Sequence, residues 1–132
     1  MENLSDSNLY NLYKKWPLES HKWESYFYIY EELFNQYKNK NITFVEVGVH
    51  NGGSLFMWRD YFGKNSRIIG IDLNPNAKLL EKYGFEIFIG SQNNSIFWNN
   101  FYSEVGEIDI LLDDGSHDYY DQLITLKKAI PN

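Results

Sequence analysis

Residues 42–54, ITFVEVGVHNGGS, join a short apolar segment to a glycine-rich turn, and this combination decides the fold. The first half, Ile42 to Val47, is rich in β-branched residues and apolar enough to form a buried central strand of a parallel sheet. The glycines that follow let the backbone turn sharply and approach a ligand closely. Ser54 or Gly53 can cap the helix that the next apolar residues indicate. A strand, a glycine turn and a helix form the first half of a nucleotide-binding βαβ unit.

The alternation of strands and helices continues along the rest of the chain. Further strands are predicted at residues 67–71, 85–89 and 108–112, and further helices at residues 75–83, 95–102 and 118–129. Strands that alternate with helices of about ten residues are typical of a doubly wound, mostly parallel sheet with right-handed crossovers. We therefore predict an α/β, Rossmann-like fold with additional helices at the N-terminus.

The N-terminal segment, residues 1–40, is predicted to be helical and separate from a Rossmann-like domain over residues 41–132. A short helix is expected over residues 4–15 and a longer one over about 20–38, where aromatic residues recur at spacings of three or four. The aromatic face of the longer helix is expected to cover the sheet. The alternatives are a lid over a substrate or a dimer contact, so a homo-oligomer is possible.

Composition and charge exclude several classes of protein. One domain is expected from 132 residues, and a hydrophobic fraction of 43% is too high for a wholly disordered chain. A net charge of −6 with scattered Lys and Arg argues against nucleic-acid binding. No apolar run approaches the roughly 20 residues of a membrane-spanning helix, and the N-terminus has no signal-peptide features. Since the chain also has no cysteine, which fits a reducing compartment, we expect a cytoplasmic protein without a membrane partner.

Polar segments follow the predicted strands, at the sheet edge where open α/β proteins bind ligands. Asp72 ends the second strand at about the distance from the glycine turn at which an acidic residue binds a ribose diol. This predicts an adenosine-containing ligand, and the alternative is a tight turn and a capping Asp without a ligand. The turn reads G-V-H-N-G-G instead of G-x-G-x-x-G, which disfavours a nicotinamide cofactor.

These residues resemble those of class I S-adenosylmethionine-dependent methyltransferases. The sequence V-E-V-G-V-H-N-G-G-S at residues 45–54 is similar to their first motif, and I-I-G-I-D-L at residues 68–73 is similar to their second. The sequence L-L-D-D-G-S-H at residues 111–117 resembles a narrower group, the metal-dependent sugar O-methyltransferases related to macrocin and mycinamicin O-methyltransferases. Cephalosporin hydroxylase-like proteins are similar relatives. The resemblance covers residues 42–131.

The resemblance implies a site for S-adenosylmethionine. Glu46 and Gly48 would line the methionine end of the cofactor, whose carboxylate can meet backbone N–H groups at the turn and the helix start. Asp72 would bind the ribose hydroxyls. The other expected cofactor-binding residues are Gly52, Ser54, Ser91, Gln92 and Asp113, of which Ser91 and Gln92 match the segment beside the adenine.

The same resemblance implies that Asp114 ligates a divalent metal and that His117 is the general base. A sugar hydroxyl is a poor nucleophile near neutral pH, so a metal that lowers its pKa and a base that takes its proton both favour methyl transfer. Asp offers hard oxygen to Mg²⁺, and His titrates in the useful range. The alternative is a turn and a helix cap, with His117 as an exposed residue of the first helical turn. His50, in the glycine turn, is expected to be a surface residue and not a ligand.

The resemblance also implies that the chain is incomplete. The family's sheet has seven strands, and its remaining metal carboxylates are expected on the fifth, after Asn132. We therefore interpret residues 41–132 as a cofactor-binding domain truncated before that strand, which would leave the strand at 108–112 as an exposed edge. The predicted function is methyl transfer from S-adenosylmethionine to a hydroxyl of a small-molecule sugar or glycoside, assisted by Mg²⁺. The alternatives are an NAD(P)-dependent oxidoreductase and a non-catalytic nucleotide-binding or dimerising module.

Overall fold

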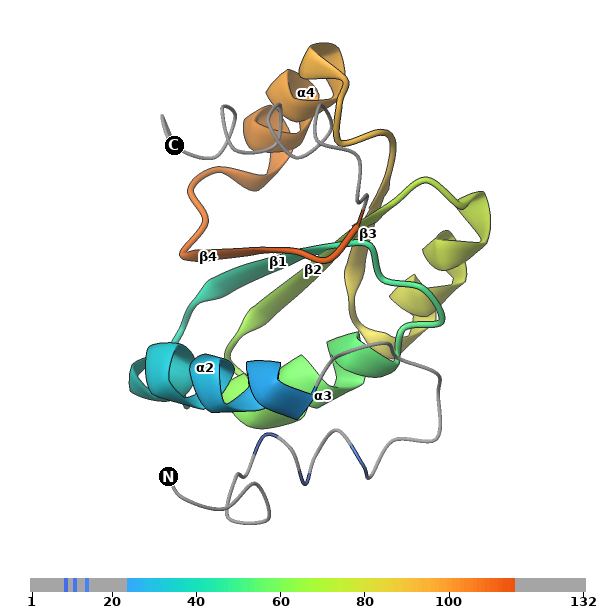
Figure 1. Ribbon diagram of the computed structural model, residues 1–132. Helices are drawn as coiled ribbons and strands as arrows, with labels where there is room; N and C mark the ends of the chain where they lie inside the picture. Colours follow the sequence, from blue (N-terminus) through green and yellow to red (C-terminus); the bar gives the residue numbers. More distant parts are fainter. Residues whose placement is uncertain (1–8, 10, 12–13, 15–23, 116–132) are drawn as a thin grey trace.

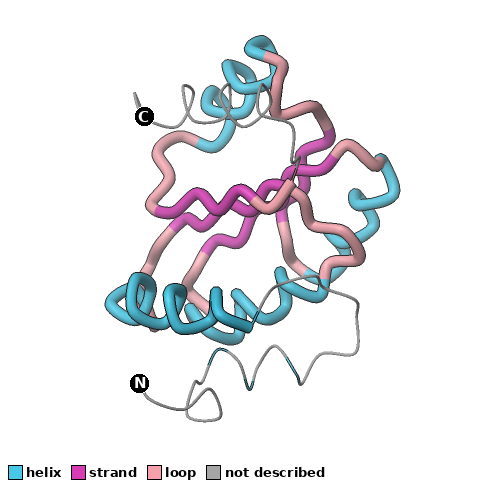
Figure 2. Tube along the Cα trace, viewed as in Figure 1, coloured by secondary structure: helices cyan, strands magenta, loops and turns pink. Residues whose placement is uncertain are grey.

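The computed structural model describes residues 9, 11, 14 and 24–115, and its centre is a parallel sheet of four strands (Figures 1 and 2). The strands are β1 (Thr43–Val47), β2 (Arg67–Asp72), β3 (Glu86–Ile89) and β4 (Ile110–Asp113). They lie in the order β3-β2-β1-β4, so the chain first extends the sheet on one side of β1 and then crosses over to place β4 on the other side. The order therefore reverses between β1 and β4. The predicted doubly wound parallel sheet is confirmed.

Helices cover both faces of the sheet. They are α2 (Glu24–Phe34), α3 (Gly53–Phe62) and α4 (Ser95–Val105), with the 3₁₀ segments η2 (Asn35–Tyr37) and η3 (Pro75–Tyr83). Figure 1 shows α2 and α3 together on one face and α4 on the opposite face. In the described part of the chain, no helix combines the length and the apolar character that passage through a bilayer requires.

The side chains of β1 alternate between two hydrophobic cores. Phe44 belongs to the larger core under α2 and α3, whereas Val45 and Val47 belong to a smaller core under α4. Tyr30 and Phe34 of α2 both contact Trp58 of the larger core edge to face, with ring centroids 5.4 and 5.6 Å apart. The described part of the aromatic helix therefore covers the sheet.

The segment η3 is a 3₁₀ helix, although an ordinary helix was the expectation for residues 75–83. With three residues per turn, Lys78 and Glu81 lie on one line along the segment. Both reach the same residue of the edge strand β3: Lys78 Nζ donates to the Ile87 carbonyl at 2.6 Å, and the Ile87 N–H donates to Glu81 Oε2 at 3.2 Å. The buried residues of η3, Ala77 and Leu80, are also three positions apart. These contacts favour the 3₁₀ form over the α-helix.

Two predicted boundaries move by a few residues. Strand β4 begins at Ile110 and not at residue 108, because the Asp109 side chain occupies the ladder position before it and accepts from Thr43 N at 2.8 Å. Helix α4 continues three residues beyond Tyr102 and ends at Val105, because the φ of 81° at the following Gly106 stops the helix. Leu9, Asn11 and Lys14 are helical, while the rest of the helix predicted at 4–15 and all of that at 118–129 lie outside the described residues.

Candidate functional site

A cavity of about 330 Å³ lies at the carboxyl ends of the strands, beside the reversal in strand order. Its lining consists of residues 47–48, 50, 71–73, 90–92 and 115. These residues come from the ends of β1 and β2 and from the segments that follow β1, β3 and β4. This is the position at which open α/β sheets bind ligands, and its volume is that of a small-molecule site.

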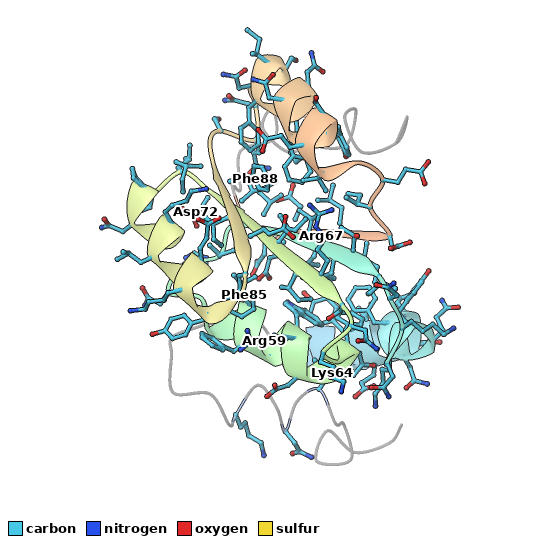
Figure 3. All side chains as sticks on the ribbon, turned by 180° about the vertical axis from the view of Figure 1, so that it is seen from behind. Arg59, Lys64, Arg67, Asp72, Phe85 and Phe88 are labelled. Atoms are coloured by element: carbon cyan, nitrogen blue, oxygen red, sulfur yellow. The ribbon has the colours of Figure 1, made fainter. Side chains whose placement is uncertain are left out.

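Asp72 links the second strand to the glycine turn. Its Oδ2 accepts from the backbone N–H groups of Val49 at 2.9 Å and His50 at 3.2 Å, and its Oδ1 accepts from Asn74 N at 2.9 Å. Figure 3 shows Asp72 at the end of the sheet opposite to Lys64. A carboxylate has about four acceptor positions, so Asp72 can hold the turn and still accept from a ligand hydroxyl. The structure thus places this predicted residue at the cavity.

Gly48 brings the ends of β1 and β4 together beneath the cavity. Its φ is 86°, and its N–H donates to the Ile71 carbonyl at 2.8 Å. A Cβ at this position would overlap the backbone of Asp114 and Gly115. Only glycine combines this backbone conformation with such a close approach. The predicted role of Gly48 at the turn therefore has a clear steric reason.

Glu46 and Ser54 lie behind the cavity wall. Both are buried, and Ser54 Oγ donates to Glu46 Oε1 at 2.5 Å. Helix α3 begins one residue earlier than Ser54, with Gly52 as its N-cap, so neither Ser54 nor Gly53 caps it. Gly52 has a φ of 90°, and a Cβ there would meet the side chain of Leu80. Glu46, Gly52 and Ser54 are not among the residues that line the cavity, so their expected contacts with the cofactor stay predictions.

Gln92 is a buried polar residue that connects the third and fourth strands at the cavity. Its Nε2 donates to Asp113 Oδ2 at 3.1 Å, and its carbonyl accepts from Trp98 Nε1 at 2.7 Å. Ser91 donates to Asn93 Oδ1 at 2.8 Å and, like Gln92, lines the cavity. The Asp113 side chain is exposed, and its carboxylate accepts the hydrogen bond that orients the Gln92 side chain. The two residues predicted beside the adenine are therefore at the cavity.

Asp114 follows β4, where its N–H donates to the Val47 carbonyl at 2.9 Å. Within residues 9, 11, 14 and 24–115, no three His, Cys, Asp or Glu side chains come close enough together to hold a metal ion. The side chains of Asp113 and Asp114 offer carboxylate oxygen, the donor that Mg²⁺ prefers, so they can form part of a ligand set. His117, the predicted general base, lies outside the described residues.

Six residues of the cavity lining were not among the predicted site residues: Val47, His50, Ile71, Leu73, Gly90 and Gly115. Two of them, Leu73 and His50, have unusual features. Leu73 is 70% exposed and presents an apolar side chain directly after Asp72. An apolar residue next to a strand-end carboxylate could have indicated it. His50 has a φ of 51°, which is uncommon for a residue other than glycine and marks a constrained turn. Nothing in the sequence indicated this conformation.

Known proteins similar to this chain are O-methyltransferases. No protein-family model matches it. The 8-demethyl-8-(2-methoxy-alpha-L-rhamnosyl)-tetracenomycin-C 3'-O-methyltransferase of Streptomyces olivaceus is 34% identical over 110 residues, which cover 78% of this chain and 27% of that protein. The mycinamicin VI 2''-O-methyltransferase of Micromonospora griseorubida is 30% identical over 95 residues, which cover 67% of this chain and 23% of that protein. The chain thus spans about a quarter of the length of these curated relatives.

Solved structures with the same fold include MycE, a methyltransferase from the mycinamycin biosynthetic pathway. Its complex with Mg, SAH and mycinamycin VI matches this chain with a TM-score of 0.79 and 26% sequence identity. The match covers 95% of this chain and 33% of that chain. A complex of MycE with Mg and SAH gives the same TM-score over 35% of its chain. In sequence and in fold, this chain therefore matches part of the S-adenosylmethionine-dependent sugar O-methyltransferases of the macrocin and mycinamicin type.

Proposed function

We propose that this chain holds the cofactor-binding part of an S-adenosylmethionine-dependent O-methyltransferase that acts on a hydroxyl of a sugar or glycoside. The observation that carries the proposal is the cavity at the reversal in strand order, with Asp72 at its wall. Supporting evidence comes from relatives named as O-methyltransferases of a rhamnosyl tetracenomycin and of mycinamicin VI. A solved neighbour in complex with SAH and Mg supports both the cofactor and the metal.

The cavity residues suit the parts of an adenosine-containing cofactor. Asp72 would accept hydrogen bonds from the ribose diol through the acceptor capacity that the backbone leaves. Leu73 and the segment at residues 90–92 would flank the adenine, with apolar surface from Leu73 and polar atoms from Ser91 and Gln92. Backbone N–H groups at the turn and at the start of α3 would face the carboxylate of the methionine part.

The chemistry requires little of the protein beyond orientation and proton transfer. S-adenosylmethionine supplies a methyl group on a sulfonium that is already activated by its positive charge. Asp114 would give one carboxylate to Mg²⁺, whose charge lowers the pKa of a bound sugar hydroxyl. His117 would take the hydroxyl proton as the methyl group is transferred. Asp113 would orient Gln92 at the cavity wall, as it does in the structure.

Calorimetric titration of this chain with S-adenosylhomocysteine and, separately, with NADH tests the proposal. We expect S-adenosylhomocysteine to bind and NADH to bind at least about tenfold more weakly, because the glycine turn lacks the dinucleotide pattern. Tighter binding of NADH would favour the oxidoreductase alternative. If neither ligand binds to the folded chain, the proposed cofactor site is wrong.

A further inference from the structure

Glu46 is a carboxyl group held entirely inside the protein, at the end of β1. Its neighbours in the strand, Val45 and Val47, pack in the core under α4, so alternation directs the Glu46 side chain to the face that α3 covers. There it accepts from Ser54 Oγ in the first turn of α3. A buried carboxyl is tolerated only when it is hydrogen-bonded, and Ser54 supplies one of these bonds.

The hydrogen bond between Ser54 and Glu46 joins the two ends of the segment that contains the glycine turn. The two residues are eight positions apart, and the glycine turn at residues 48–53 is part of the segment between them. Gly52, the N-cap of α3, has no side chain with which to cap the helix. The first turn of α3 is therefore held against the end of β1 by the Ser54 side chain instead of by a side-chain N-cap.

Asp72 holds the same turn from its other side. It accepts from Val49 N and His50 N, whereas Glu46 fixes the end of the turn at Ser54. The two carboxyl groups differ in access, because Asp72 lines the cavity and Glu46 has no exposed surface. Only Asp72 can touch a ligand without rearrangement of the chain.

We propose that Glu46 is a positioning residue: through Ser54 it holds the glycine turn in the shape that binds the cofactor, and it does not contact the cofactor itself. A turn fixed before binding presents its backbone N–H groups to the ligand without an ordering cost. The inference rests on the proposed function for the identity of the ligand. It replaces the expectation that Glu46 lines the methionine end.

The first test compares the affinity of the 132-residue chain for S-adenosylhomocysteine in two variants. Ser54→Ala removes the donor and should weaken binding about 5- to 30-fold. Glu46→Gln keeps an acceptor oxygen for Ser54 but removes the charge, so its affinity should stay within about threefold of the wild type. A direct contact between the Glu46 charge and the cofactor predicts the reverse ranking.

Ser66→Ala is the matched control, because Ser66 Oγ also makes a short hydrogen bond, to the Gly63 carbonyl at 2.6 Å. Ser66 directly precedes Arg67, the first residue of β2, whereas Asp72 is the last residue of that strand. The affinity of this variant for S-adenosylhomocysteine should equal that of the wild type. The proposal is overturned if Glu46→Gln binds more weakly than Ser54→Ala, or if Ser54→Ala binds no more weakly than the control.

Amide hydrogen exchange without any ligand gives a second, independent test. In Ser54→Ala, the N–H groups of Val49, His50 and Gly52 should exchange about tenfold faster, while the amides of β2 keep their wild-type rates. Unchanged exchange in the turn would overturn the positioning role. Because this measurement needs no cofactor, it separates failure of the positioning role from failure of the proposed function, which would appear as loss of binding in the wild type.

Discussion

Asp72 contributes to the site in two ways, by holding the turn and by facing the cavity. Replacing it with Ala removes the acceptor for three backbone N–H groups. It also removes the acceptor that we propose for the ribose. We expect weaker S-adenosylhomocysteine binding by about 1 to 3 kcal/mol, together with a lower melting temperature. Calorimetry and thermal melts measure the two effects.

Asp109→Ala is the control for Asp72→Ala. Asp109 also accepts from a backbone N–H, that of Thr43 at 2.8 Å, but it does so at the amino end of the sheet. It should lower the melting temperature and leave the affinity unchanged. Equal affinities for Asp72→Ala and wild type would mean that Asp72 acts only on the backbone.

A comparison of Gly48→Ala with Gly106→Ala separates two costs of an added Cβ: overlap with a neighbouring backbone and strain from a positive φ. Both glycines have positive φ, 86° and 81°, but a Cβ at Gly106 meets nothing within 4 Å, whereas one at Gly48 overlaps the backbone of Asp114 and Gly115. Gly106→Ala should cost about 1 kcal/mol in the free energy of unfolding, and Gly48→Ala about 2 kcal/mol more. Urea unfolding measures both, and similar losses would contradict the close approach.

The sequence could place several residues at the cavity for a simple reason: side chains at the ends of parallel strands must meet at one edge of the sheet. This placed Gly48, Asp72, Ser91 and Gln92 at the cavity. It did not reveal that Glu46 turns away from the cavity. The face of the sheet to which a side chain points decides which of the two cores it enters. The packing of segments that are distant in sequence determines where these cores lie.

At the scale of elements, the sequence predicted the strands and the helical segments between them in their order along the chain, because apolar, β-branched runs alternate with longer amphipathic segments. The 3₁₀ form of η3 was not predicted. Spacings of three and four residues both fit residues 75–83, and the choice depends on contacts of Lys78 and Glu81 with Ile87 in β3. Such contacts between separate elements leave no local signal.

The contact between η3 and β3 should depend on pH. The backbone hydrogen bond from Ile87 lowers the pKa of Glu81 below its usual value of 4.5, and Lys78 adds to the effect. Because the folded-state pKa is the lower one, the stabilisation is present above pH 4.5 and is lost as the pH falls through the folded value. The melting temperature of wild type should exceed that of Glu81→Gln at pH 7, and the two should converge as the pH falls through the lowered pKa of Glu81. A difference that persists at low pH would show that the Glu81 charge is not its cause.

At the scale of the whole molecule, the described part of the chain holds a cavity of small-molecule size but no group of three or more His, Cys, Asp or Glu side chains that could hold a metal ion. Mg²⁺ prefers six oxygen ligands, and the carboxylates of Asp113 and Asp114 supply few of them. We expect Mg²⁺ to bind this chain only in the millimolar range, and S-adenosylhomocysteine to bind equally well with and without it. Calorimetric titrations with and without a chelator measure both. Micromolar Mg²⁺ affinity would require ligands beyond the described residues.

The two cores of the molecule each contain a fully buried tryptophan, and the two indoles have different surroundings. Trp58 lies in the core under α3, where its Nε1 has no hydrogen-bond partner among the described residues. Trp98 lies in the core under α4 and donates to the carbonyl of Gln92 at the cavity wall. The emission of Trp98 should therefore respond to a ligand in the cavity, while that of Trp58 follows only the unfolding of the opposite face. Of the four tryptophans in the sequence, these two therefore report on different events, Trp98 on binding and Trp58 on stability.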